Sequence, residues 1–343
     1  MMPARLIGRF VLRSAVLFVL LRSISSGAAE VGAWIDLQEI ENDFELRRMT
    51  LEGGGDVGMR LFSLGRQIDL ELGSQVAKVN GVRIHLAQPL RLEGNRTVLL
   101  RLDWETAIRP LLSLAGQNLE TLRPPVHIWI DPGHGGKDGG AENTTLGLLE
   151  KNLTLGVALL LEKRLLERGY TVDFTRRDDR FIPLAERSLM ANAGGADLFL
   201  SIHFNAWYDD KVAGVETFVL PPATLPSTDA GSGDSAGEAF AGNRFDTLNT
   251  LFAYHLQRNL LLGTEDLDRG VKRAKFAVLK NLDCPGALVE LGFLTHPESG
   301  ARFLSPNGLD RLARMLAEGI DQYAGEVRRA TGAAAENPVG SSR

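Results

Sequence analysis

Apolar and polar residues alternate in short stretches over residues 30–120. Examples are QIDLEL, VRIHLA and TVLLRLDW, which are separated by glycine and asparagine. Alternation with a period of two is typical of strands with one buried face, and the Asn-Gly pair in KVNGVRI is typical of a tight hairpin turn. The pattern therefore predicts a small β-rich domain over 30–120, followed by a linker at 121–125.

From residue 126 onward, apolar runs alternate with helical stripes. VHIWID, YTVDFT and ADLFLSI are expected strands, and Leu153, Val157, Leu161 and Leu165 recur at helical spacing between the first two. Further strands are expected in GVETFVL, FAVL and GALVEL, and further helices in PLAERSLMANAGG, around 248–262 and near 309–327. This order predicts an α/β domain over 126–327, with a mostly parallel sheet flanked by helices.

The first 29 residues have the three parts of a secretory signal. A basic start precedes the apolar run AVLFVLL, and the small residues GAA follow as a cleavage site. The apolar run is shorter than the ~20 residues that span a bilayer. We therefore expect residues 1–29 to be a signal peptide; the alternative is an uncleaved start that associates loosely with a membrane. At the other end, residues 328–343 are expected to form a disordered tail.

Two other features bear on the class of protein. The net charge is −5, which argues against nucleic acid as the main partner because phosphate binding needs a basic surface. The chain has one cysteine, Cys284, which cannot form an internal disulfide and is expected to be a small buried side chain. Residues Thr224–Asn243 are rich in Gly, Ser, Ala and Asp and are expected to form a flexible loop, either a lid or a plain surface loop.

The stretch IWIDPGHGGKDGG, residues 128–140, places one histidine among glycines. A phosphate-binding loop would need Ser or Thr after Gly136-Lys137, where this chain has Asp138. A dinucleotide-binding fingerprint would need a glycine at that same position. Both phosphate interpretations therefore fail.

A metal site fits the same stretch better. His134 and His203 each follow a predicted strand, and the carboxyl ends of parallel strands meet at one edge of a sheet. Glu150 opens the helix between them, and two imidazoles with one carboxylate form a typical catalytic zinc set. Glu290 ends the apolar run GALVEL, where an acid is costly unless it has a partner or a task.

Each of these residues also has a simpler interpretation when it is taken alone. A single histidine is more often structural than a ligand, Glu150 could favour a helix N-terminus, and Glu290 could be a buried ion-pair partner. Their convergence at strand ends favours the metal site.

Several other polar residues are interpreted as structural. Arg176, Asp179 and Arg187 are expected to form an ion-pair set rather than a substrate clamp. His296 is expected to lie in a loop, and His255 to be a surface or packing residue on a helix.

Several motifs carry a resemblance to a known family. DPGHGGKDGGA, EKN, SIHFNA, GVETF, DRGVKRAKFAVL and PGALVELGFL resemble, in that order, the zinc-dependent N-acetylmuramoyl-L-alanine amidases of the amidase 3 type. The resemblance covers about residues 126–327. It implies an α/β fold and hydrolysis of the amide between N-acetylmuramic acid and the L-alanine of the stem peptide. It also implies Zn²⁺ bound by His134, Glu150 and His203, with Glu290 as the catalytic residue.

The first domain carries a weaker resemblance. VNGVRI followed by LAQPL is similar to the copper amine oxidase N-terminal-like module of exported bacterial proteins. That resemblance implies no metal site. Residues 30–120 contain no convergent set of titratable groups. We therefore expect the second domain to fold and bind zinc without residues 30–120.

The sequence thus predicts an exported zinc amidase, periplasmic or cell-wall associated, that acts on peptidoglycan as a monomer. The sequence does not identify a protein activator. Alternatives are another zinc amide hydrolase of stem peptides and a non-catalytic cell-wall binding protein. The second ring nitrogen of His134 is expected to be held by Asp131 or by a backbone carbonyl of the turn.

Overall fold

The computed structural model describes residues 33–51, 57–115, 122–228, 237–264 and 266–332. The predicted signal peptide, the last eleven residues of the predicted tail and the centre of the 224–243 loop lie outside these ranges. Within them, no helix is both long and apolar enough to cross a membrane.

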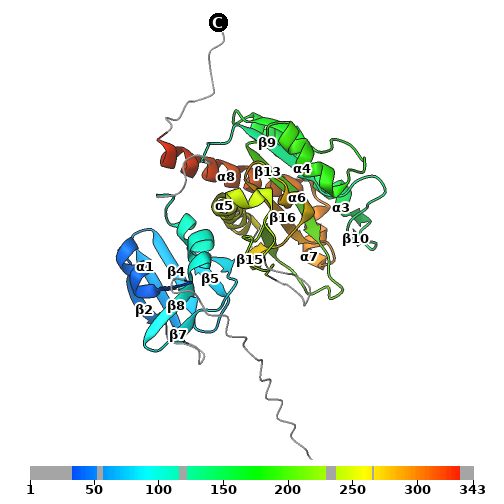
Figure 1. The fold of residues 1–343 in the computed structure, drawn as a ribbon. Coiled ribbons are helices and arrows are strands. Elements are labelled where there is room, and N and C mark those ends of the chain that lie inside the picture. The colour runs from blue at the N-terminus through cyan, green and yellow to red at the C-terminus, as the bar shows by residue number, and fades with distance from the viewer. Residues whose placement is uncertain (1–32, 52–56, 116–121, 229–236, 265, 333–343) are drawn as a thin grey trace, which may run out of the picture.

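Residues 33–115 form a β-rich unit, which we call the N-terminal unit (Figure 1, blue to cyan). Its strands are β1 (Trp34–Asp36), β2 (Arg47–Leu51), β3 (Gly58–Ser63), β4 (Arg66–Glu71), β5 (Val76–Val79), β6 (Val82–His85), β7 (Arg91–Glu93) and β8 (Arg96–Leu100). Its helices are α1 (Leu37–Phe44), α2 (Arg101–Asp103), the π-helix η1 (Trp104–Ile108) and the 3-10 helix η2 (Arg109–Leu111). The Asn80-Gly81 turn joins antiparallel β5 and β6 with positive φ at both residues, as the sequence predicts.

Residues 122–332 alternate strands and helices. The strands are β9 (His127–Pro132), β10 (Glu142–Asn143), β11 (Leu148–Leu149), β12 (Thr171–Phe174), β13 (Leu198–Asn205), β14 (Val215–Val219), β15 (Asp268–Arg273) and β16 (Gly286–Phe293). The helices are α3 (Glu150–Leu166), α4 (Leu184–Ala193), the 3-10 helix η3 (Ala241–Phe245), α5 (Asp246–Thr264), α6 (Ala277–Lys280), α7 (Pro297–Phe303) and α8 (Pro306–Thr331). Helix α8 continues to Thr331, so the predicted disordered tail begins too early at residue 328.

One eleven-stranded sheet runs through both units, in the order β12-β9-β13-β16-β14-β15-β6-β5-β4-β3-β2. Strands β12, β9, β13 and β16 are mutually parallel, as are β14 and β15. The sheet as a whole is nevertheless mixed rather than mostly parallel, because β14 is antiparallel to β16 and the strands from β6 to β2 of the N-terminal unit pair as antiparallel hairpins. The fold is therefore α/β with a large mixed sheet.

Helices cover both faces of the sheet in residues 122–332. Helices α3, α5 and α8 share one core, and α4 and α6 pack on the opposite face around Trp129, Phe199 and Leu288. The predicted stripe on α3, from Leu153 to Leu165, is buried against the first core. Cys284 is buried in the second core, as predicted.

The α3 stripe gives a direct test of this packing. Leu161 is fully buried, whereas Leu159 on the same helix is 42% exposed. We expect Leu161→Ala to lower the free energy of unfolding by about 2–5 kcal/mol, because it removes buried methyl groups and leaves a cavity. Leu159→Ala is the matched control and should change the free energy of unfolding by less than about 0.5 kcal/mol, as measured by denaturant titration. Equal effects of the two changes would contradict the packing of α3.

Candidate metal centre

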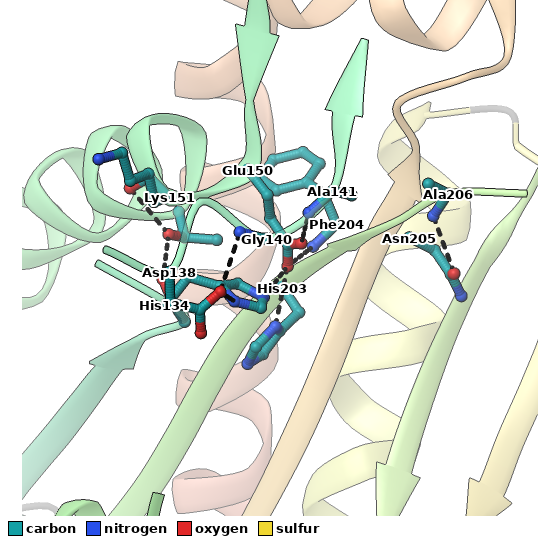
Figure 2. A network of polar contacts seen from close by, with 12 residues as sticks. His134, Asp138, Gly140, Ala141, Glu150, Lys151, His203, Phe204, Asn205 and Ala206 are labelled. Atoms are coloured by element: carbon teal, nitrogen blue, oxygen red, sulfur yellow. Dashed lines mark hydrogen bonds and ion pairs between the residues drawn. The ribbon is translucent and has the colours of Figure 1, made fainter. Parts of the chain in front are cut away.

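Three side chains converge at the carboxyl edge of the parallel strands. His134 lies in the turn after β9, Glu150 is the first residue of α3, and His203 lies near the end of β13. Their candidate ligand atoms all lie within 4.8 Å of one another. Figure 2 shows Glu150 between the two histidines. The structure thus brings together the three residues that the sequence singled out as ligands.

The distances between these atoms fit a single metal ion. Glu150 Oε1 lies 3.0 Å from His134 Nε2 and 2.9 Å from His203 Nδ1. Donors about 2.0–2.1 Å from a tetrahedral metal are about 3.3 Å apart, so small side-chain shifts would place all three in a coordination shell. The two imidazole rings are nearly perpendicular, with centroids 4.9 Å apart.

The pKa values of Glu150 and His134 are shifted in opposite directions. Burial acts to raise the pKa of Glu150, but hydrogen bonds and charge from His134 and His203 outweigh burial and hold that pKa well below its usual range. Burial acts to lower the pKa of His134, yet Glu150 and Asp138 together raise it. Glu150 is therefore a carboxylate ready to bind a cation.

Two glycines of the turn make room for the ligands themselves. A Cβ on Gly133 would lie 2.3 Å from Cε1 of His203. Gly140 has a φ of +68°, and a Cβ there would lie 2.5 Å from Oε2 of Glu150 and 2.6 Å from Cδ2 of His134. Larger residues at either position would push the ligand side chains apart.

Two buried arginines hold the turn that carries His134. Arg187 donates to Asp131 Oδ1 at 2.8 Å and to the backbone carbonyl of His134 at 2.9 Å. Arg176 donates to the carbonyls of Pro132 and Gly133 at 2.9 and 2.7 Å. Both side chains are almost fully buried. They are structural, as the sequence predicts, although they mainly hold backbone carbonyls and Asp131.

The prediction for Asp179 is wrong in its partner. Asp179 pairs with Lys151 Nζ at 2.8 Å and accepts a hydrogen bond from the backbone of Gly136, rather than pairing with Arg187. The Asp179 side chain is exposed beside the turn, whereas the buried Arg187 pairs with Asp131.

The group beside the second ring nitrogen of His134 is Asp138, not Asp131. Asp138 Oδ1 lies 2.9 Å from His134 Nδ1. Asp131 is fully buried in β9, where it accepts hydrogen bonds from Thr175 and Ser201 as well as Arg187. Asp138 lies four residues after His134 in the glycine-rich turn, and that spacing is the signal that could have identified it.

Glu290 lies beside this centre on the next strand. It pairs in register with His203 across parallel β13 and β16. Its Oε2 is shielded from solvent and has no hydrogen-bond partner among the described residues. Burial raises the pKa of Glu290 well above its usual range, and the nearby charges of Glu150 and Glu216 raise it further.

Glu216 is a second buried acid that the sequence analysis did not single out. It lies on β14 directly opposite Glu290 and is 3% exposed. Arg269 Nε and Lys272 Nζ each lie 3.0 Å from its Oε2, and Asn205 donates to its Oε1 at 2.8 Å. An acid inside the apolar stretch GVETFVL carries the same signal that pointed to Glu290.

Two other histidines that the sequence analysis considered lie away from the centre. His255 is buried on α5, with its Nε2 3.3 Å from Glu326 Oε1, so it is a packing residue. His296 lies between β16 and α7 and accepts a hydrogen bond from the backbone of Ser299, in agreement with the predicted loop position.

Comparison with known proteins gives matches in the same part of the chain. The family model described as N-acetylmuramoyl-L-alanine amidase matches residues 128–322. The sporulation-specific N-acetylmuramoyl-L-alanine amidase of Bacillus subtilis (strain 168) is 33% identical over 199 residues, covering 57% of this chain and 68% of that protein. The N-acetylmuramoyl-L-alanine amidase AmiA of Escherichia coli (strain K12) is 31% identical over 221 residues, covering 57% of this chain and 75% of that protein.

A solved structure adds a likeness of fold. The CwlD amidase from Clostridioides difficile, in complex with the GerS lipoprotein, has a TM-score of 0.50 and 24% identity over 58% of this chain and 98% of that one. The family match begins after the N-terminal unit, whose resemblance to the copper amine oxidase module stays a prediction. The chain therefore belongs to the N-acetylmuramoyl-L-alanine amidase family and is a hydrolase that acts on peptidoglycan.

Proposed function

We propose that this amidase is zinc-dependent and that His134, Glu150 and His203 are its metal ligands. The observation that carries the proposal is the placement of Glu150 Oε1 about 3 Å from a nitrogen of each histidine. Two imidazoles and one carboxylate suit Zn²⁺, and such a set leaves a fourth position open for the reaction. When bound, zinc would polarise the scissile carbonyl and make water more acidic.

The bond to be cleaved joins the lactyl carbonyl of N-acetylmuramic acid to the amine of L-alanine. Hydrolysis adds water to the carbonyl carbon and breaks the C–N bond, so one proton must leave the water and one must reach the amine. We assign both transfers to Glu290, which would take the proton from water and deliver it to the leaving nitrogen. Its unpartnered Oε2 and its position beside His203 support this role.

The remaining assignments follow from the substrate. Peptidoglycan lies outside the cytoplasm, so we propose that residues 1–29 direct export to the periplasm or cell wall. We assign hydrolysis to residues 126–327 and treat the protein as a monomer, with peptidoglycan as its partner.

Digestion of purified sacculi tests the activity. We expect the zinc-loaded protein to release free stem peptides with an L-alanine amino terminus, and to leave the glycan strands intact. Mass spectrometry of the products, with and without a chelator, measures both. Cleavage within the stem peptide would identify a different zinc amide hydrolase, and no release by zinc-loaded protein would favour a wall-binding role.

Replacement of the ligands tests the metal set. His134→Ala and His203→Ala should each remove most of the bound zinc and all useful activity, because two protein ligands hold the ion far more weakly than three. His127→Ala, at the other end of β9, is the control and should keep one zinc per chain. Zinc content is read by atomic emission after gel filtration. Full occupancy in the His134→Ala/His203→Ala double variant would rule out this site.

Glu290→Gln separates a proton-transfer role from a ligand role. Glutamine keeps the shape of the side chain but cannot take a proton, so zinc content should stay normal while kcat falls by about 10²-fold or more. Glu298→Gln, at an exposed position on α7, should leave both unchanged. If Glu290→Gln loses its zinc, Glu290 is a ligand and the assignment is wrong.

A further inference from the structure

Strand β15 is shared between the two units of the chain. On one side it pairs with β14, and on the other with β6 of the N-terminal unit, where Ile84 lies opposite Val271. The backbone N–H of Arg83 donates to Asp268 Oδ2 at 2.8 Å, and His85 Nε2 donates to the backbone carbonyl of Arg269 at 2.9 Å. The N-terminal unit therefore contacts β15 through both backbone and side chains. Figure 1 shows β15 on the side of its sheet that faces this unit.

The same junction contains a fully desolvated ion pair. Arg273 Nη1 on β15 donates to Asp103 Oδ1 at 2.7 Å, and the two side chains are 5% and 0% exposed. Asp103 also accepts hydrogen bonds from the backbone of Ala87 and Gln88. A buried charge that loses its partner is strongly destabilising, so the N-terminal unit supplies a charge that β15 needs. This argues against the expectation that the second domain works without residues 30–120.

The backbone at this junction also requires close approach. Gly270 has a φ of +88°, and a Cβ there would lie 2.8 Å from the carbonyl oxygen of Arg83. Strand β15 is thus fixed against β6 at the two residues on either side of Gly270, which are Arg269 and Val271.

On its other side, β15 supplies the cations that hold Glu216. Arg269 Nε and Lys272 Nζ both reach Glu216 Oε2 at 3.0 Å. Because Glu216 is almost fully buried, its position depends on these two side chains and on the amide of Asn205. A shift of β15 would therefore move Glu216.

Glu216 lies in a row of polar side chains that ends at the metal centre. In register across neighbouring strands, Glu216 is opposite Glu290, and Glu290 is beside His203. Asn205, which donates to Glu216, lies two residues after His203 on β13. Glu216 thus contacts the strand that carries a ligand and faces the proposed proton-transfer residue.

We propose that the N-terminal unit is a positioning part of the active site: by fixing β15, it places Arg269 and Lys272 so that Glu216 holds Asn205, and through Asn205 keeps the end of β13 beside Glu290 in the geometry for reaction. Glu216 is a positioning residue in this scheme, and Asp103 acts on it from a distance through Arg273 and β15. The proposal rests on the role given above to Glu290.

Two substitutions in the full-length zinc-loaded protein test this coupling. Glu216→Gln should lower kcat on a soluble muropeptide by about tenfold or more, with zinc content unchanged and KM within about twofold. Asp103→Asn should lower kcat by about three- to tenfold, the scale expected for coupled residues. If Asp103 acts through Glu216, the Asp103→Asn/Glu216→Gln double variant should be no slower than Glu216→Gln alone.

A matched control separates this coupling from general destabilisation. Asp69 pairs with Arg60 within the N-terminal unit, away from β15, and Asp69→Asn should leave kcat unchanged. All rates are expressed per folded, zinc-loaded molecule, so a loss of folded protein alone does not count. If Asp103→Asn does not fold, His85→Ala takes its place, because it removes the side-chain hydrogen bond to the carbonyl of Arg269.

The outcomes are distinct. Rate losses that multiply in the double variant, or no loss in Asp103→Asn and His85→Ala, would overturn the proposal while the amidase assignment stands. Failure of the zinc-loaded wild-type protein to release stem peptides would instead overturn the proposed function.

Discussion

A buried carboxylate must be paired with positive charge or accept hydrogen bonds. Four acids lie at the carboxyl edge of the parallel strands, and this requirement applies to each of them. Asp131 is met by Arg187 and two hydroxyl groups, and Glu216 by a lysine, an arginine and an amide. Glu150 is met by two imidazoles and two backbone amides. Among the described acids at this edge, Glu290 has an oxygen with no donor, and the residue lies in register with His203 on the neighbouring strand. Three of the four acids are thus held by their partners, and this difference is the reason for which the proton transfers are assigned to Glu290 in the proposed function.

The candidate metal centre depends on a backbone turn that is itself unfavourable. His134 has a φ of +62°, a conformation that costs a residue with a Cβ roughly 1–2 kcal/mol. Arg176 and Arg187 hold the three carbonyls of residues 132–134, so the surrounding hydrogen bonds outweigh this cost. A ligand fixed in this way needs little rearrangement when the ion binds, which is the general advantage of a rigid supporting layer around a metal site.

The sequence predicts many local parts of this structure, although the stretch FAVL, expected to be a strand, forms the start of helix α6. The α3 stripe, the strand that precedes each histidine and the start of a helix at Glu150 all follow from short-range periodicity, and the edge at which parallel strands end brings them together. The antiparallel pairing of β14 with β16 does not follow from such patterns, because it depends on which strands become neighbours. The partner of His134 Nδ1 depends on side-chain directions within a glycine-rich turn. Glu216 could have been found by the argument used for Glu290, since both are acids in apolar strands.

The continuity of the sheet has a consequence for the order in which the protein folds. Arg83 and Asp268, which meet at the β6–β15 junction, are 185 residues apart in the chain. During synthesis the hairpins β2 to β6 are complete long before β15 exists, and pairings between such distant segments form slowly. Until then, β6 presents an open strand edge that can pair with another chain. The nascent protein therefore passes through a stage in which its first third can aggregate, and the completion of β15 ends that exposure.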